Sequence, residues 1–183
     1  MDDMRGHIRE SNLIEGITDP GEIDQSFISW RTLLEQPVLT HEAIRRAQAI
    51  VCHNQRDLAD NQKGFYRSES RVDVRVGSHV APPWQKVDAL MESWLAAYPA
   101  RAPWGNHVDF EHIHPFRAGN GRAGRMIMWW QEVREGHAPT LFKRADRFDY
   151  YERLQRGRAS EEDREAEARR MLALINGWSD RLV

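Results

Sequence analysis

The 183-residue sequence predicts a mainly α-helical fold with one small β element. Most apolar residues recur every three or four positions, which is the period of a helix with one buried face. One segment instead alternates apolar and charged residues through Val72, Val74 and Val76 and ends at Gly77, a pattern typical of a strand. The sequence has no internal repeat and no long linker, so we expect a single domain over residues 1–183.

Capping residues and prolines locate the expected helices. Asp19, Pro20 and Glu22 predict a helix that begins near residue 20 and ends near residue 35. Thr40 predicts the start of a second helix that continues to about residue 53. Further helices are expected between Pro83 and Pro99, in the histidine-rich stretch near residues 107–113, from about Gly121, and from Ser160 through Met171, Leu172 and Ile175.

The composition excludes several classes of protein. Charged residues make up 30% of the chain and the formal net charge is −2, so we expect no binding to nucleic acid, which usually requires a basic surface. Cys52 is the single cysteine, which excludes an internal disulfide and a cysteine-based zinc site. No export signal and no run of about 18 apolar residues are present. We therefore expect a cytoplasmic protein that does not enter membranes.

The stretch from His114 to Arg125 carries the clearest chemical signal. Gly119, Asn120 and Gly121 are small residues that lead directly into a helical pattern. Because backbone N–H groups at a helix N-terminus are unpaired and the dipole there is positive, such a loop favours a phosphate group.

Three side chains near this loop can act on a bound phosphate compound. Arg122 and Arg125 lie three positions apart at the start of the helix, where both guanidinium groups can point at one anion. His114 precedes the loop and has a side chain whose proton moves near neutral pH. A Gly-Asn-Gly sequence can also simply separate two helices, but that explanation leaves His114 and the arginines unexplained.

The histidine-rich stretch also raises the question of a zinc site. His107 and Glu111 share one helix face, whereas His112 and His114 do not align with them. We therefore expect no metal site here, and expect His107 and Glu111 to support the loop by packing or hydrogen bonds.

This region resembles the core motif of the Fic family (filamentation induced by cAMP), H-P-F-x-D/E-G-N-G-R-x-x-R. The segment Gly64-Phe65-Tyr66-Arg67 and the segment Tyr150-Tyr151-x-x-Leu154 are also similar to the family, so the resemblance spans most of the chain. The matching motif residues are His114, Pro115, Phe116, Gly119, Asn120, Gly121, Arg122 and Arg125.

The resemblance implies a Fic-like helical bundle that transfers AMP from ATP to a hydroxyl group of a target protein. By this resemblance His114 is the general base, and residues 119–121 bind the α- and β-phosphates. Arg122 and Arg125 then neutralise the β- and γ-phosphates, while Phe116, after Pro115, anchors the loop. These roles fall within residues 107–135.

The same resemblance makes residues 61–81 a flap, in which Val72, Val74 and Val76 form a β-hairpin. The flap of the family docks an extended segment of the target protein by strand addition. An ordinary edge strand explains the valine alternation equally well.

Ala118 departs from the family motif. Family members that transfer AMP carry Asp or Glu at this place, where the carboxylate binds Mg²⁺, and a methyl group cannot coordinate a cation. Two outcomes remain open. Mg²⁺ arrives with the nucleotide, held by phosphate oxygens and water, and gives a weaker enzyme; or AMP transfer is lost, and the chain uses another phosphate compound or only binds.

Residues 11–16, Ser-Asn-Leu-Ile-Glu-Gly, match the inhibitory motif of the family, S/T-x-x-x-E-G/N, through Ser11, Glu15 and Gly16. The resemblance implies an inhibitory helix over residues 1–18, in which Glu15 pairs with Arg125 and forces ATP into an unproductive position. The alternative is that Ser11 starts a turn and Glu15 merely lies at a helix end.

The sequence thus predicts a self-inhibited AMP transferase that uses ATP as co-substrate. Two alternatives stay open: a nucleotide-binding or protein-interaction module with the same fold, and a variant that removes AMP or transfers another phosphate group. The target protein, the nucleotide base and the oligomeric state do not follow from the sequence.

Overall fold

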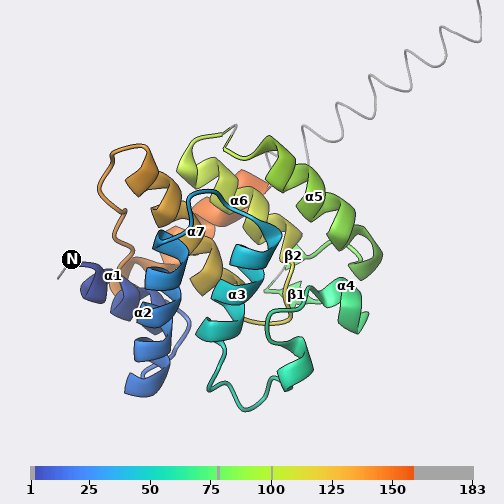
Figure 1. Ribbon diagram of the computed structural model, residues 1–183, viewed down its shortest axis with the longest axis horizontal. Coiled ribbons are helices and arrows are strands. Elements are labelled where there is room, and N and C mark those ends of the chain that lie inside the picture. Colours follow the sequence, from blue (N-terminus) through green and yellow to red (C-terminus); the bar gives the residue numbers. More distant parts are fainter. Residues whose placement is uncertain (1–2, 78, 100, 159–183) are drawn as a thin grey trace, which may run out of the picture.

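The computed structural model describes residues 3–77, 79–99 and 101–158. Within them, the expected mainly helical fold with one small hairpin is confirmed (Figure 1). The helix expected from Ser160 lies outside the described residues. The helices are α1 (Asp3–Ile14), α2 (Pro20–Leu34), α3 (His41–Val51), α4 (Arg67–Ser70), α5 (Val87–Ala97), α6 (Pro103–Ile113) and α7 (Asn120–Arg134), and residues 147–158 are also helical. Short 3₁₀ turns occupy Asp60–Gln62, Trp84–Lys86 and Arg144–Asp146.

The predicted caps of the second and third helices are confirmed. The Asp19 side chain accepts a hydrogen bond of 3.0 Å from the Glu22 N–H, with Pro20 in the first helical turn. The Thr40 hydroxyl accepts one of 3.1 Å from the Ala43 N–H. Each side chain satisfies a backbone donor that the helix cannot pair internally, which fixes where the helix begins.

The core is built around α7, which packs against α1, α2, α3 and α6 (Figure 1). Trp129 on α7 is fully buried, and its ring meets Trp30 of α2 edge to face at 6.2 Å. Gly124 allows the close approach of α6, because a Cβ atom there would lie only 2.9 Å from Nδ1 of His107. These contacts fix the position of α7, whose N-terminal turn follows directly on the loop of residues 114–119.

The hairpin is shorter than the sequence predicts. Strand β1 (Arg75–Val76) pairs antiparallel with β2 (His79–Val80), in the register Arg75 to Val80 and Val76 to His79. The expectation that Val72 and Val74 belong to this strand is wrong.

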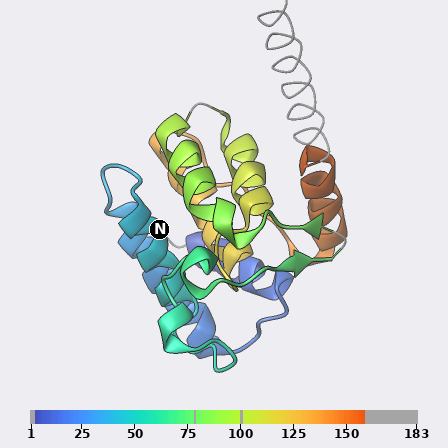
Figure 2. The ribbon, with the colours of Figure 1, turned by 90° about the vertical axis from the view of Figure 1, so that its right-hand side faces the viewer.

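The reason lies in the end of α4. Arg71 adopts a left-handed conformation with φ of 55°, and the Val72 N–H bonds the Arg67 carbonyl at 3.1 Å. The backbone of Val72 therefore closes a helix instead of joining a ladder. The hairpin itself extends toward the helix of residues 147–158 (Figure 2).

No helix in the described ranges is both long enough and apolar enough to span a membrane.

Candidate active site

His114 ends α6 in an uncommon backbone conformation. Its φ and ψ are 49° and 61°, in the left-handed region, and its N–H donates to the Phe110 carbonyl at 2.9 Å. A non-glycine residue rarely adopts this conformation, and such residues gather at functional sites. The turn places the imidazole ring in the wall of two adjoining cavities.

The loop after His114 is closed by the side chain of Asn120. Its amide donates to the Phe116 carbonyl at 2.8 Å and accepts from the Phe116 N–H at 2.9 Å. Phe116 is fully buried and packs on Tyr66 with a centroid distance of 5.1 Å. The Asn120 amide is thus engaged inside the loop.

Helix α3 supports the loop through the side chain of Gln48. Gln48 is buried; its amide donates to the Ala118 carbonyl at 3.0 Å and accepts from the Gly64 N–H at 2.6 Å. Gly119 has φ of 76°, and a Cβ atom on it would lie 2.6 Å from Sγ of Cys52. Burial raises the pKa of the Cys52 thiol to about 11, so this side chain is a neutral packing group.

Arg67 joins the hairpin region to the start of the loop at His114, a contact that the sequence did not predict. Its side chain is completely buried. The guanidinium donates to the carbonyls of His114 at 2.8 Å and of Ile113 at 3.2 Å, and also to those of Val72 and Pro82. A cation at the C-terminus of α6 satisfies carbonyls that the helix leaves unpaired.

Arg125 is fully buried, and all three of its nitrogens have partners. Nε donates to the Ser11 hydroxyl at 2.8 Å, Nη1 to the Tyr150 hydroxyl at 3.0 Å, and Nη2 to Glu15 Oε1 at 2.7 Å and to the Ser11 carbonyl at 3.0 Å. The pairing of Glu15 with Arg125, which the resemblance implies, is present in the structure.

Glu15 also lies directly against the first turn of α7. A Cβ atom on Gly121 would collide with Glu15 Oε1. Glu15 follows α1, and Gly16, with φ of 75°, turns the chain away behind it. The carboxylate therefore lies where the unpaired N–H groups and the helix dipole favour an anion.

Arg122 is engaged elsewhere. It donates to Glu22 at 3.2 Å, to the Val51 carbonyl at 3.0 Å and to Gln55 at 3.2 Å. Thus α2 and α3 hold Arg122, whereas α1 and the helix of residues 147–158 hold Arg125. The two guanidinium groups, which we expected to point at one anion, have different partners in this structure.

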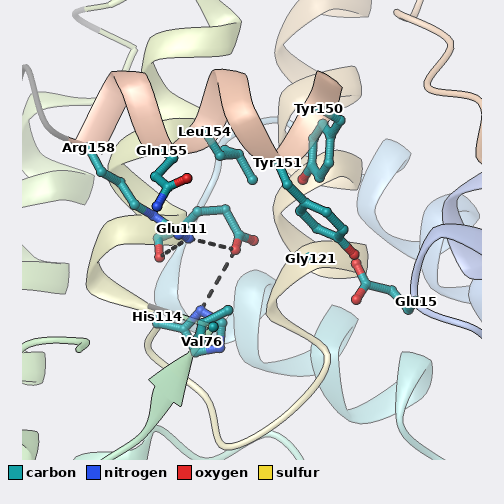
Figure 3. A pocket seen from close by; sticks show the side chains of 11 residues that line it. Glu15, Val76, Glu111, His114, Gly121, Tyr150, Tyr151, Leu154, Gln155 and Arg158 are labelled. Carbon is teal, nitrogen blue, oxygen red and sulfur yellow. Dashed lines mark hydrogen bonds and ion pairs between the residues drawn. The ribbon is translucent and has the colours of Figure 1, made fainter. Parts of the chain in front are cut away.

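Two adjoining cavities meet at this point, of about 350 and 450 Å³, and four residues line both. The smaller one continues along the helix of residues 147–158 (Figure 3), and the larger one along the loop of residues 119–122. Of the three flap valines, Val76 lines both cavities, and Val72 and Val74 line neither. The four shared residues are Glu15, Val76, His114 and Gly121.

Glu111, which we expected to support the loop, faces two charged or titratable side chains. Its Oε2 lies 3.7 Å from Nδ1 of His114 and 3.6 Å from Nη2 of Arg158 (Figure 3). The signal available in the sequence was the spacing of three between Glu111 and His114 on a helix, which brings two side chains together.

The carboxylates near the loop are few and partly engaged. No group of three or more His, Cys, Asp or Glu side chains within the described residues is arranged to hold a metal ion. Ala118 packs against the core, and Glu22 in the larger cavity is paired with Arg122. Two further carboxylates, Glu15 and Asp57, also line the larger cavity.

The site is thus a glycine-containing loop at the N-terminus of α7, with His114 beside it and the Glu15 carboxylate against the first helical turn. A family model described as the Fic/DOC family matches residues 38–131, which is just over half of the chain. The chain belongs to the Fic/DOC family. The matched range contains the loop and most of α7 but not α1 with Glu15.

Relatives with curated names share this region. The chain is 36% identical over 94 residues to a protein named protein adenylyltransferase Fic from Culex quinquefasciatus, covering 46% of this chain and 19% of that protein. It is 33% identical over 102 residues to a protein of the same name from Nematostella vectensis, covering 51% and 23%. The matches thus span about a fifth of the length of these relatives.

Solved structures share the fold. A Fic domain containing signaling protein from Bacteroides thetaiotaomicron superposes with a TM-score of 0.71 at 18% identity, covering 84% of this chain and 71% of that one. Fic-1 from C. elegans, residues 134–508, also gives 0.71 at 18% identity and covers 86% and 56%.

Proposed function

We propose that the protein transfers AMP from ATP to a hydroxyl group of a target protein, and that Glu15 restrains this activity. One observation carries the proposal: the Glu15 carboxylate contacts both Arg125 and the N-terminal turn of α7. Both are places that favour an anion. The names of the adenylyltransferase relatives support the choice of reaction.

The chemistry follows from the position of His114. The imidazole, in the wall of both cavities, accepts the proton of the target hydroxyl. The hydroxyl oxygen then forms a bond to the α-phosphorus of ATP, and the bond between that phosphorus and the bridging oxygen to the β-phosphate breaks. The electron pair leaves with pyrophosphate, and the products are an AMP ester of the target, pyrophosphate and a protonated histidine.

The loop supplies the electrostatic part of catalysis. The N–H groups at the start of α7, around Gly121, bind the oxygens of the α- and β-phosphates without having to move. Arg125 is the donor that a γ-phosphate reaches once Glu15 departs. The aromatic and aliphatic wall of Tyr150, Tyr151 and Leu154 in the smaller cavity suits the nucleoside.

The hairpin is the proposed docking place for the target. Val76 of β1 faces the cavities beside His114, and Val80 of β2 is 61% exposed. An extended segment of the target that pairs with this hairpin brings its hydroxyl to the imidazole.

The test uses ATP labelled on the α-phosphate with the Glu15→Gly variant, Mg²⁺ and a cell lysate. We expect that variant to label protein strongly and the wild type weakly. With ATP labelled on the γ-phosphate, the Glu15→Gly variant adds no label beyond that of the lysate alone, because that phosphate leaves with pyrophosphate. Adding His114→Ala to the Glu15→Gly variant abolishes the signal if the histidine is the base.

Ala118 favours a second candidate, a nucleotide-binding module that does not transfer AMP. This candidate predicts that the Glu15→Gly variant stays inert while ATP still binds in calorimetry, also after His114→Ala. Restoration of labelling by Ala118→Asp in the inert variant assigns the defect to the metal contact. Absence of any nucleotide binding contradicts both candidates.

A further inference from the structure

A buried carboxylate lies behind the proposed base. The Glu111 side chain is 5% exposed, and it lines the smaller cavity together with His114 and Arg158. In Figure 3, dashed lines join the Glu111 carboxylate to the His114 imidazole and to the Arg158 guanidinium. We call these three residues the Glu111 cluster. Glu111 lies on α6, His114 ends α6, and Arg158 lies on the helix of residues 147–158.

The Glu111 cluster contains buried polar atoms that make no hydrogen bond with any described residue. Within the described part of the chain, neither Nδ1 of His114 nor Oε1 of Glu111 has a hydrogen-bond partner. Buried polar atoms without partners are rare in folded proteins, and catalytic sites are one place where they occur. At 3.7 Å the His114 and Glu111 atoms face one another beyond hydrogen-bond length, although catalytic contacts often shorten when substrate binds.

Glu111 is ionised in this environment. Burial acts to raise its pKa. The opposing effects of His114, His107 and Arg158 are together larger, and the pKa of Glu111 is lowered to about 2. A negative charge therefore faces the imidazole near neutral pH.

We propose that Glu111 is a positioning residue for the transfer reaction, which holds the proton of neutral His114 on Nδ1 and leaves Nε2 free to accept the proton of the target hydroxyl. This inference rests on the proposed function. A carboxylate next to one ring nitrogen fixes the tautomer and the orientation of the ring, and it stabilises the imidazolium that forms during the reaction. Glu111 itself takes up no proton.

Arg158 completes the arrangement. Its Nη2 also donates to the Glu111 carbonyl at 3.1 Å, so it is anchored to α6. Its positive charge compensates Glu111, which a buried carboxylate requires. Substitution of Glu111 by a neutral residue leaves the positive charge of Arg158 uncompensated. That charge then disfavours protonation of the His114 imidazole.

Other charged and titratable groups also face His114. His79 comes from β2 and interacts electrostatically with both His114 and Arg158. Arg67 contacts the carbonyl of His114, and Glu15 lines the same cavities. Within the described residues, Glu111 is the ion-pair partner of the His114 ring, so we assign the positioning role to it.

The kinetic test compares Glu111→Gln with its parent in the Glu15→Gly background. Glutamine preserves the volume of the side chain and removes its charge. We expect kcat to fall by about 10- to 100-fold, by analogy with the carboxylates that orient metal-bound histidines, with little change in KM for ATP. The acid limb of the pH–rate profile moves to lower pH, because the imidazolium loses its counter-charge. An unchanged kcat and pH profile, or a change confined to KM, overturns the proposal.

Two further variants separate positioning from general damage. Glu111→Asp keeps the charge, so it should preserve the acid limb better than Glu111→Gln does. Glu152→Gln removes a carboxylate from the exposed side of the helix of residues 147–158, and it should leave kcat and the pH profile unchanged. Equal losses in Glu111→Asp and Glu111→Gln count against the proposal.

A measurement without turnover tests the same inference independently. Nitrogen-15 NMR of histidine-labelled protein reports the tautomer of each ring, and His114→Gln assigns the His114 signals. We expect the Nδ1–H tautomer in the otherwise wild-type protein and a shift toward Nε2–H in Glu111→Gln. The same tautomer in both proteins overturns the proposal. If the Glu15→Gly variant transfers no AMP, the proposed function fails, and the NMR result still decides the role of Glu111.

Discussion

Glu15 Oε1 accepts a hydrogen bond of 2.7 Å from Nη2 of Arg125, although the two residues are 110 positions apart in the chain. The other nitrogens of Arg125 are directed to Ser11 and Tyr150. In this state the guanidinium is already saturated by side-chain and backbone oxygens. An incoming phosphate has to replace the carboxylate.

Glu15→Gln should therefore strengthen ATP binding. A hydrogen bond between charged groups contributes about 1.5–3 kcal/mol, so loss of the competing charge should lower the Kd by about tenfold or more. Isothermal titration calorimetry measures this change. Glu35→Gln, at the exposed end of α2, is the matched control and should leave the Kd unaltered. Equal affinities of Glu15→Gln and wild type contradict competition at Arg125.

Arg67→Met should destabilise the fold strongly. The substitution leaves the buried carbonyls of Ile113, His114 and Pro82 without this donor, and each unsatisfied buried group costs about 1–3 kcal/mol. We expect a loss of about 3 kcal/mol or more, and a melting temperature about 10 °C lower for a chain of this size. Thermal unfolding followed by circular dichroism measures it. Arg46→Met, on the exposed side of α3, should change the melting temperature little.

Two glycines allow backbone strain to be separated from steric collision. Gly119 and Gly136 have similar φ angles of 76° and 81°, but only at Gly119 does a Cβ atom meet a buried neighbour, Cys52. Alanine at either position adds strain of about 1 kcal/mol. Gly119→Ala should cost about 1–3 kcal/mol beyond Gly136→Ala, because it also overpacks the core.

Urea unfolding gives the two free energies. In a double-mutant cycle with Cys52→Ala, part of the cost of Gly119→Ala should disappear, since the colliding sulfur is gone. Equal costs for the two glycine substitutions are inconsistent with α3 as the support of the loop.

Stability should decrease on acidification because of His107. Burial lowers the pKa of this histidine from 6.5 to about 4, so between these values the unfolded chain binds more protons than the folded one. The free energy of unfolding then falls as the pH is lowered from 6.5 to 4, by at most about 1.4 kcal/mol per pH unit.

Urea unfolding at several pH values between 4 and 7 measures this slope, and His107→Gln should make it shallower. The contribution of Glu111 lies mainly below this window, because its pKa falls from 4.5 to about 2 on folding. A slope that His107→Gln leaves unchanged assigns the acid sensitivity to other groups.

Ala118→Asp should make ATP binding more dependent on Mg²⁺. The new carboxylate lies on the loop whose backbone carbonyl Gln48 already holds in place, so it is directed by a fixed scaffold. We expect the Mg²⁺ concentration for half-maximal ATP binding to fall. Ala118→Asn has the same shape without the charge and should show a smaller effect. Identical Mg²⁺ dependence in all three proteins argues against residue 118 as the position of the missing contact.

Local sequence determines much of the fold and part of the site. The caps at Asp19 and Thr40 act within three residues, so their helix starts can be predicted from the chain alone. The contact between Glu15 and Arg125 was implied by a motif resemblance, because each partner lies in its own short pattern. These cases need no knowledge of how the helices pack.

The remaining features depend on tertiary structure. Arg67 binds backbone carbonyls, which carry no sequence signal, from segments that only the fold brings together. The separation of Arg122 from Arg125 arises because α7 enters between two sets of helices, which spacing along one helix does not reveal. The short hairpin follows from the left-handed conformation of Arg71. An arginine in the sequence does not predict this conformation.

The two hydrogen bonds between the Asn120 side chain and the Phe116 backbone affect how the proposed enzyme is activated. These bonds and the one from Gln48 hold the loop in shape without any bound nucleotide. Activation of the proposed enzyme then requires only that the Glu15 carboxylate leaves Arg125. The rate of activation is set by how fast the C-terminal end of α1 dissociates from this site.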